Sequence, residues 1–462
     1  MELKDLLLAP FYLAIIYAFA FRFRKNNTDK FTKRYYIPAL TVKLVGAVAL
    51  GLIYQFYYKG GDTYNYFHDS GIIWEALLDS PSIGIKMLLS QGRTFDYDTY
   101  LYTQQMHFYS DYASYTIVRV SAFIGFFTFH TYTINALLFA CLSFSGVWAL
   151  FRAFNNIYPQ LHKELAIAIF FLPSVFFWGS GLMKDTICMG ALGWLFYGFY
   201  FGTIKKNKIF KSIIIITVSM FVLITVKVYI LLAFFPPGLF WIFNENNARI
   251  KNKLLKIIAK PAFFTVGIIA AYFGATRLTQ GDVRYDISKI GERTKINSEY
   301  LYAVSMQENG SAYSIGSFDG SLGSIFAVAP QAVNVALFRP YLWEVRNPVM
   351  LLSSLEATAF LLLTIYLFLR TGIGNSIRLI ALEPLLTFCF IFCIIMAFAV
   401  GVNSFNFGTL VRYKIPLMPF YLGALYIMRF YTDKKRYKLY IATKKQKAKE
   451  KYRPGVATIT LS

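Results

Sequence analysis

Asp62 and Asp69 lie in the stretch Gly60–Ser70, directly after an apolar segment. The glycine pair that opens this stretch allows a sharp turn as the chain leaves the bilayer, and Asp62 then stands where a helix N-cap would stand. If residues 63–78 are helical, Asp62, Tyr66 and Asp69 share one helix face. A carboxylate held there can accept a proton from a hydroxyl group. We therefore take both aspartates as candidate catalytic residues. The alternative is that Asp62 only caps the helix and Asp69 is solvated.

Basic and aromatic side chains in later stretches suit a substrate that contains phosphate and sugar. Guanidinium and ammonium groups stabilise the charge that develops on a leaving phosphate, and aromatic rings stack on sugar faces. Ionisable residues at a membrane are costly, so several groups of them together predict a site. The alternatives are local ion pairs, lipid headgroup contacts and an interfacial anchor. The candidate substrate-binding residues are Lys184, Asp185, Arg339, Trp343, Glu344, Arg346, Arg412 and Tyr413.

The composition indicates which class of protein positions these residues. Of 462 residues, 56% are hydrophobic and 15% are charged, which is too apolar for a soluble domain of this length. The sequence predicts an all-α, polytopic transmembrane helix bundle. Its net charge of +23 comes from short basic runs between apolar segments and from the tail, as in cytoplasmic loops that face anionic lipid. The expected partners are therefore membrane lipid and a lipid-linked sugar substrate, without nucleic acid; no protein partner is indicated.

The positive-inside rule predicts how the chain is threaded through the membrane. The first apolar segment precedes a basic loop, which places the N-terminus outside and the C-terminus in the cytoplasm. Crossing by every apolar stretch would break the rule, so we expect 115–129 and 321–338 to be embedded without crossing. About eleven spans remain, at 6–21, 37–57, 131–151, 165–180, 186–204, 209–226, 229–243, 261–276, 349–369, 379–400 and 411–430.

This topology predicts a membrane domain, 1–430, and a basic cytoplasmic tail, 431–462. We expect the two embedded stretches to help wall an externally open cavity beside Asp62, because irregular backbone at membrane depth is tolerated only against protein or water. The candidate residues then share the external side of the inner (plasma) membrane. The predicted external segments are 58–112, 179–185, 277–347 and 401–412.

Three motifs together resemble one group of bacterial membrane proteins. Gly60-Gly61-Asp62-x-Tyr64, Leu172-Pro173-Ser174 through Lys184-Asp185, and Arg412-Tyr413-x-x-Pro416 are similar to motifs of multi-span GT-C-type glycosyltransferases and of O-antigen and exopolysaccharide polymerases. The resemblance implies a catalytic aspartate in the first external loop, which falls on Asp62, and a polyprenyl phosphate sugar donor. This chain differs from the pattern by an extra span ahead of that loop and by the lack of a paired acidic residue there.

We therefore expect a membrane glycosyltransferase or polysaccharide polymerase of cell-envelope biosynthesis. It would transfer a sugar or oligosaccharide from a polyprenyl-(pyro)phosphate carrier to an acceptor at the external face. The chain lacks a glycine-rich phosphate loop followed by Lys-Ser/Thr, so a nucleotide donor is not indicated. No cofactor is expected, and the four histidines have no metal-ligand spacing, so no metal site is predicted; the sequence leaves open whether a divalent ion assists. The alternatives are a transporter or flippase of lipid-linked saccharide and a non-catalytic scaffold of an envelope assembly.

Overall fold

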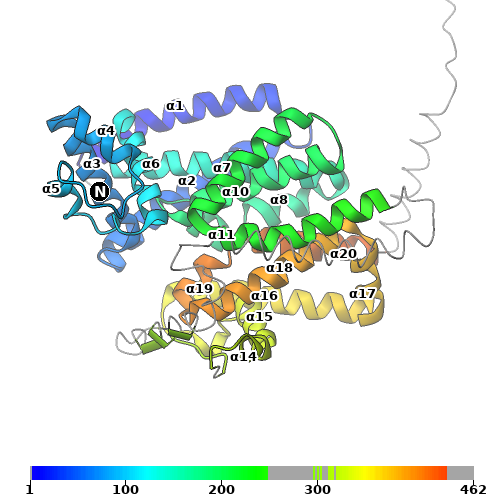
Figure 1. Cartoon of the computed structure of the whole chain (residues 1–462). Coiled ribbons are helices and arrows are strands. Elements are labelled where there is room, and N and C mark those ends of the chain that lie inside the picture. The colour runs from blue at the N-terminus through cyan, green and yellow to red at the C-terminus, as the bar shows by residue number, and fades with distance from the viewer. Residues whose placement is uncertain are drawn as a thin grey trace, which may run out of the picture.

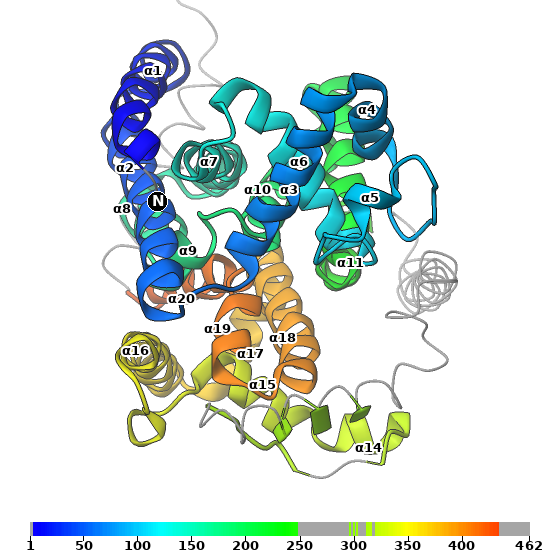
Figure 2. The ribbon, with the colours of Figure 1, turned by 90° about the vertical axis from the view of Figure 1, so that its left-hand side faces the viewer.

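The computed structural model describes residues 3–247, 311–316 and 319–433, with three short pieces at 295–296, 299–300 and 302–303. These residues form helices, with one isolated β-bridge between Ala312 and Asn406, so the predicted all-α class is confirmed. Helices α14 to α18 lie below α1 to α10 in Figures 1 and 2.

The helices in chain order are α1 (Leu3–Asn27), α2 (Lys33–Leu52), α3 (Asp62–Asp79), α4 (Pro81–Leu89), α5 (Tyr100–Thr103), α6 (Tyr112–Thr128), α7 (Tyr132–Ile157), α8 (His162–Phe170), α9 (Pro173–Trp178), α10 (Lys184–Phe199), α11 (Ile209–Asn247), α14 (Leu322–Ala327), α15 (Ala329–Phe338), α16 (Pro348–Thr371), α17 (Ile373–Leu382), α18 (Pro384–Ser404), α19 (Phe407–Tyr413) and α20 (Met418–Thr432). Short π-helical turns at Ile53–Tyr57 and Tyr200–Ile204 extend α2 and α10.

Seven of the described helices are long and apolar enough to cross a membrane: α1, α2, α7, α10, α11, α16 and α18. The chain is thus consistent with an integral membrane protein. The expected count of about eleven spans is not confirmed. The predicted span 165–180 is divided between α8 and α9, 411–430 is divided between α19 and α20, and 261–276 lies outside the described residues.

Helix α11 folds back on itself at Lys227, where the sequence predicts an interruption. The backbone angles there, φ −148° and ψ 78°, are not helical. Near one end of α11, Ser212 lies against Gly202, and near the other Asn246 accepts a hydrogen bond from Lys206. A straight 39-residue helix would be about 58 Å long, so its two ends could not both reach one short segment. The two limbs are visible in Figure 1.

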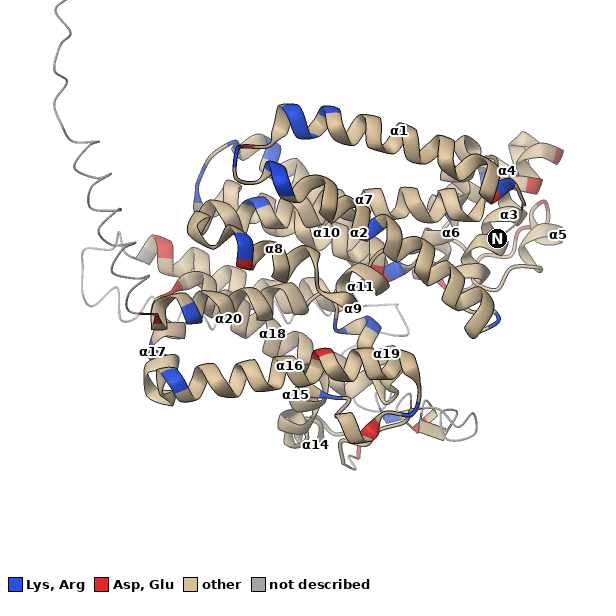
Figure 3. Cartoon of the chain, turned by 180° about the vertical axis from the view of Figure 1, so that it is seen from behind, with Lys and Arg blue, Asp and Glu red and all other residues tan. Residues whose placement is uncertain are grey.

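The charged residues differ between the two ends of the bundle (Figure 3). We call one end the basic end, because Arg24, Lys25, Arg370 and Arg429 lie there in the last turns of α1, α16 and α20. The opposite end contains α3 to α6 and the start of α10, and we call it the α3 end. Helix α10 starts at the α3 end, and the segment that follows its last residue lies beside both termini of α11. The turn at Lys227, in the middle of α11, therefore lies at the α3 end.

Close contacts between small residues and between aromatic rings hold these helices in register. A Cβ atom on Gly146 of α7 would lie 1.8 Å from the carbonyl oxygen of Gly190 of α10, so the two backbones are in contact. Small residues permit this approach between membrane helices. Four phenylalanine rings from α7, α10, α18 and α20 pack together in the core, with centroids 5.1 to 6.0 Å apart: Phe154, Phe196, Phe388 and Phe420.

The stretches that we expected to be embedded form shorter helices. Residues 115–129 lie mostly in α6, and residues 321–338 are divided between α14 and α15. With 6 and 10 residues, α14 and α15 are about 9 and 15 Å long, too short to cross a hydrocarbon core of about 30 Å.

Pockets of about 340 and 350 Å³ lie elsewhere among the described residues, and neither of these borders Asp62. The first is an apolar pocket between α1, α2 and α7. The second lies at the basic end and is lined by Asp29, Arg152 and Asn156 among others. The expected cavity beside Asp62 is neither of these two pockets.

Candidate functional site

Arg412 joins two carboxylates from distant parts of the chain. Its Nη2 atom lies 2.9 Å from Oδ2 of Asp62 and 3.5 Å from Oδ2 of Asp185. Its Nη1 atom donates a hydrogen bond of 3.3 Å to the hydroxyl group of Tyr54. The Asp62 side chain is 42% exposed and that of Asp185 only 1%. The guanidinium group therefore lies between a carboxylate that faces solvent and one that does not.

Lys227 is the second cation on the buried carboxylate. Its Nζ atom donates a hydrogen bond to Oδ1 of Asp185 and lies 4.0 Å from the centre of the Tyr413 ring. Both partners of this ion pair are almost completely buried. In the sequence, Lys227 marks only the gap between the predicted spans 209–226 and 229–243. A signal was nevertheless present, because an ionisable residue inside a span is costly and therefore indicates a partner or a site.

Lys184 begins a second set of polar contacts beside the first. Its Nζ atom lies 3.6 Å from Oδ2 of Asp111 and donates a hydrogen bond of 3.0 Å to Oγ of Ser114. Ser114 in turn donates to Asp111, and the hydroxyl groups of Ser114 and Tyr66 lie 3.5 Å apart. Burial raises the pKa of Tyr66, so its hydroxyl keeps its proton.

Two glycines place Asp62 at the start of α3. Gly60 and Gly61 have φ values of 137° and 118°, a region that glycine adopts without strain. Gly61, and not Asp62, is the N-cap residue, and Asp62 is the first residue of α3. The expectation that Asp62 occupies the N-cap is therefore wrong by one position. Its side chain is held by Arg412, and a carboxylate in the first helical turn is favoured by the helix dipole.

A short broken helix, α9, precedes Lys184 and Asp185. Its buried ends need partners because no water is available at membrane depth. At its start, the backbone N–H and hydroxyl groups of Ser174 donate to the Glu356 carboxylate, at 3.0 and 2.5 Å. At its end, the carbonyl oxygen of Gly179 accepts hydrogen bonds from Lys43 and Ser143. Two buried charges thus hold the segment that leads into the site.

Asp69 lies outside the contacts of Arg412. Its side chain is completely buried, so it is not solvated as the alternative interpretation assumed. Its two oxygens accept hydrogen bonds from the backbone N–H groups of His107, at 3.0 Å, and Phe108, at 2.8 Å. Asp69 therefore fixes the segment before α6 to α3.

The remaining candidates form a separate group next to α19. Arg339 binds both carboxylate oxygens of Glu344 through Nε, at 3.0 Å, and its guanidinium carbon lies 5.3 Å from the centre of the Phe407 ring. Trp343 is 81% exposed, and Arg346 is also exposed. Phe407 and Arg412 are five residues apart on α19, about 7.5 Å along the helix axis. The two groups are thus close to each other without a direct contact between Arg339 and Arg412.

Residues from all four predicted external segments meet at the α3 end. The ion pairs above join residues from 58–112, 179–185 and 401–412. Residues 311–313 pair with the end of α18, where the N–H groups of Tyr313 and Phe407 donate to the carbonyl oxygens of Phe405 and Ser311. Lys414 donates a hydrogen bond of 3.1 Å to the carbonyl oxygen of Arg339.

The arrangement combines an accessible proton acceptor with fixed cations. Three acidic and three basic side chains alternate through the site, so it has no net charge: Asp62, Asp111, Asp185, Lys184, Lys227 and Arg412. Nε of Arg412 and Oδ2 of Asp185 are buried without a hydrogen-bond partner in the described part of the chain. The guanidinium group therefore has an unused donor.

No protein-family model matches the sequence, and neither a curated protein nor a solved structure matches it.

Proposed function

We propose that the chain is a membrane glycosyltransferase or polysaccharide polymerase that uses a polyprenyl-(pyro)phosphate-linked sugar donor. The observation that supports this function is the position of Arg412, which is shared between exposed Asp62 and buried Asp185 at one end of a membrane bundle. A lipid-linked donor presents its phosphate at this level, next to the headgroups. The site thus provides a base and a phosphate-binding cation side by side.

The lipid phosphate competes with Asp62 for Arg412 in this mechanism. When the phosphate binds the guanidinium group, the Asp62 carboxylate is released to accept the proton of the acceptor hydroxyl. The acceptor oxygen forms a bond to the anomeric carbon, and the bond from that carbon to the phosphate oxygen breaks, with its electron pair retained by the phosphate. Arg412 and Lys184 stabilise the charge on this leaving group. Lys227 keeps Asp185 in place as the fixed partner of Arg412.

The charge difference between the two ends supports an external position for the site. Lys and Arg gather at the basic end, and basic segments are retained in the cytoplasm. Cysteines placed at two well-exposed positions of the α3 end, Tyr97 and Trp343, are expected to react with an impermeant reagent in intact cells. A cysteine at Lys30 should react only after lysis. Labelling of position 30 in intact cells would show that the chain has the opposite orientation in the membrane.

The central test replaces Asp62 with Asn, which keeps the shape of the side chain and removes the proton acceptor. Transfer from purified lipid-linked donor should fall by roughly a hundred- to ten-thousand-fold. Asp98→Asn is the matched control, because Asp98 lies in the same predicted external segment, is 63% exposed and pairs with Lys86 at the surface. Arg412→Lys keeps the charge but not the planar group that reaches two carboxylates, so donor binding and turnover should both weaken.

Mass spectrometry of lipid-linked saccharides in cells provides the second measurement. A strain with Asp62→Asn at normal protein level should accumulate unused donor. Full glycan production by this strain would remove Asp62 from the catalytic role.

A transporter of lipid-linked saccharide is the second candidate, and the broken helix α9 favours it. Interrupted helices with charges at their ends occur at transporter binding sites. In this chain, however, Lys43 and Glu356 bind the two ends of α9 itself. A transporter would leave the donor on the cytoplasmic leaflet in the deletion strain, and the purified protein would not transfer sugar.

A further inference from the structure

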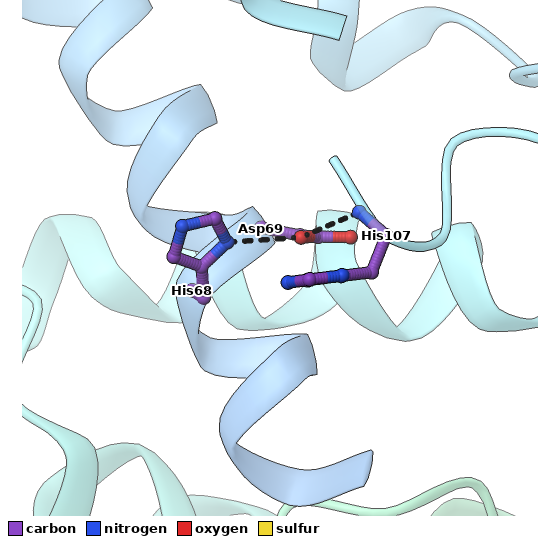
Figure 4. Close-up of side chains that lie close together, drawn as sticks. All are labelled: His68, Asp69 and His107. Carbon is purple, nitrogen blue, oxygen red and sulfur yellow. Dashed lines mark hydrogen bonds and ion pairs between the residues drawn. The ribbon is translucent and has the colours of Figure 1, made fainter. Parts of the chain in front are cut away.

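Two histidines lie on either side of the buried Asp69 carboxylate (Figure 4). His68 and Asp69 are neighbours on α3, and His107 comes from the segment between α5 and α6. One nitrogen from each histidine and one carboxylate oxygen lie within 4.8 Å of one another. The sequence shows no ligand spacing, because His107 lies 38 residues after Asp69 and reaches it only through the fold.

The surroundings of Asp69 resemble those of a prepared metal ligand. The carboxylate is 0% exposed, and backbone N–H groups of His107 and Phe108 fix both of its oxygens. Each oxygen has two lone pairs, so Oδ2 keeps one for a cation, and the second lone pair of Oδ1 faces Nδ1 of His68. A buried carboxylate is costly unless a positive charge accompanies it. The only ionisable side chain that an ion pair or hydrogen bond joins to it in the described residues is His68, at 3.2 Å.

We propose that His68, Asp69 and His107 bind one divalent transition-metal ion, with Zn²⁺ as the best match. Two imidazoles and one carboxylate are ligands that suit Zn²⁺, with bonds of about 2.1 Å and ligand atoms about 3.4 Å apart in a tetrahedral site. The ligand atoms, now within 4.8 Å of one another, would have to approach to this distance, and the histidine rings that would rotate lie on the exposed side: His68 is 54% exposed. Hydrogen bonds to the carboxylate keep the third ligand oriented.

The ion would fix the segment before α6 to α3. Asp111 follows His107 by four residues, caps α6 through the N–H group of Ala113 and pairs with Lys184. A metal ion at His107 therefore restrains the segment that carries one of the site's three carboxylates. This role does not depend on the proposed transferase activity.

The test measures Zn²⁺ binding to the full chain, purified without a polyhistidine tag and freed of metal with a chelator. Competition with a chromophoric chelator and elemental analysis should give one Zn²⁺ per chain. His68→Ala and His107→Ala should each weaken binding at least about ten-fold, and the double variant should abolish it. His162→Ala is the matched control, because His162 lies at the basic end beside Arg34 and should not change binding.

A folding control separates loss of the ligand from loss of the protein. Zn²⁺ should raise the melting temperature of the wild-type chain and of His162→Ala, because a ligand that binds only the folded state stabilises it. Zn²⁺ should not raise the melting temperature of the His68→Ala, His107→Ala double variant. The melting temperature of this variant without metal serves as the reference. Absence of stoichiometric Zn²⁺ in the wild-type chain, or equal binding by the double variant, would overturn the proposal.

Discussion

The buried ion pair between Asp185 and Lys227 allows a quantitative test of how the site is held together. Lys227→Met leaves the Asp185 carboxylate, which is 1% exposed, with Arg412 at 3.5 Å as its remaining ion-pair partner in the described part of the chain. Asp185→Asn leaves the Lys227 ammonium group, which is 6% exposed, against the face of the Tyr413 ring at 4.0 Å. Each single change therefore creates a buried charge that is only partly compensated.

The expected free energies follow from this difference in compensation. Removing one partner of a buried pair costs about 3–5 kcal/mol, whereas replacing both by groups of similar volume is often close to neutral. We expect each single variant to lose roughly 3 kcal/mol, since Arg412 and the Tyr413 ring compensate part of the cost. The double variant should lose less than either single variant. The coupling energy of the cycle is then roughly 3 kcal/mol or more.

The assay is unfolding of the purified protein in mixed micelles, by titration with SDS and circular dichroism. The surface variant Lys86→Met is the control: Lys86 is 44% exposed and pairs with Asp96 and Asp98, so the unfolding midpoint should not change. If the loss of stability in the double variant equals the sum of the two single losses to within about 0.5 kcal/mol, the reasoning is refuted, because independent sites behave in this way.

Three further predictions concern packing, backbone satisfaction and pH. Gly146→Ala should destabilise the chain by about 1–3 kcal/mol in the same assay, because the new methyl group meets the backbone of Gly190 at 1.8 Å. The control is Gly374→Ala, which should be neutral or stabilising, because no atom lies within 4 Å of the new methyl group. Lys43→Met should lose about 1–3 kcal/mol, because it removes an ammonium group bonded to the end of α9; an unchanged midpoint would mean that Ser143 alone satisfies this end. The hydrogen bond from Ser324 lowers the pKa of Asp319 to about 2, below the usual 3.8. The ionised Asp319 carboxylate therefore contributes its full stabilisation above about pH 4, and this stabilisation is lost as the pH falls toward 2. The test compares the rate at which pepsin cleaves the loop before α14 in the wild-type chain with the rate in Asp319→Asn. This ratio of wild-type to variant rate should be higher at pH 2 than at pH 4, and an equal ratio at both pH values would contradict the prediction.

The sequence by itself determined the class of the protein and part of its site. Apolar content alone indicates a helical membrane bundle, because only helices satisfy the backbone of an apolar segment without partners from elsewhere. The distribution of Lys and Arg depends on loops and not on packing. It was therefore sufficient to predict that Asp62, Lys184, Asp185 and Arg412 belong to one end, where the structure brings them together.

Tertiary structure decided which charges meet, and where helices break. The turn at Lys227 places an ammonium group on Asp185, 42 residues away, and the ends of α9 depend on Lys43 and Glu356, from other helices. Asp69 resembles Asp62 in the sequence, yet its burial follows from backbone N–H groups 38 and 39 residues later. Periodicity and composition record how apolar each position is. The partner of a buried polar group lies far along the chain, and only packing selects it.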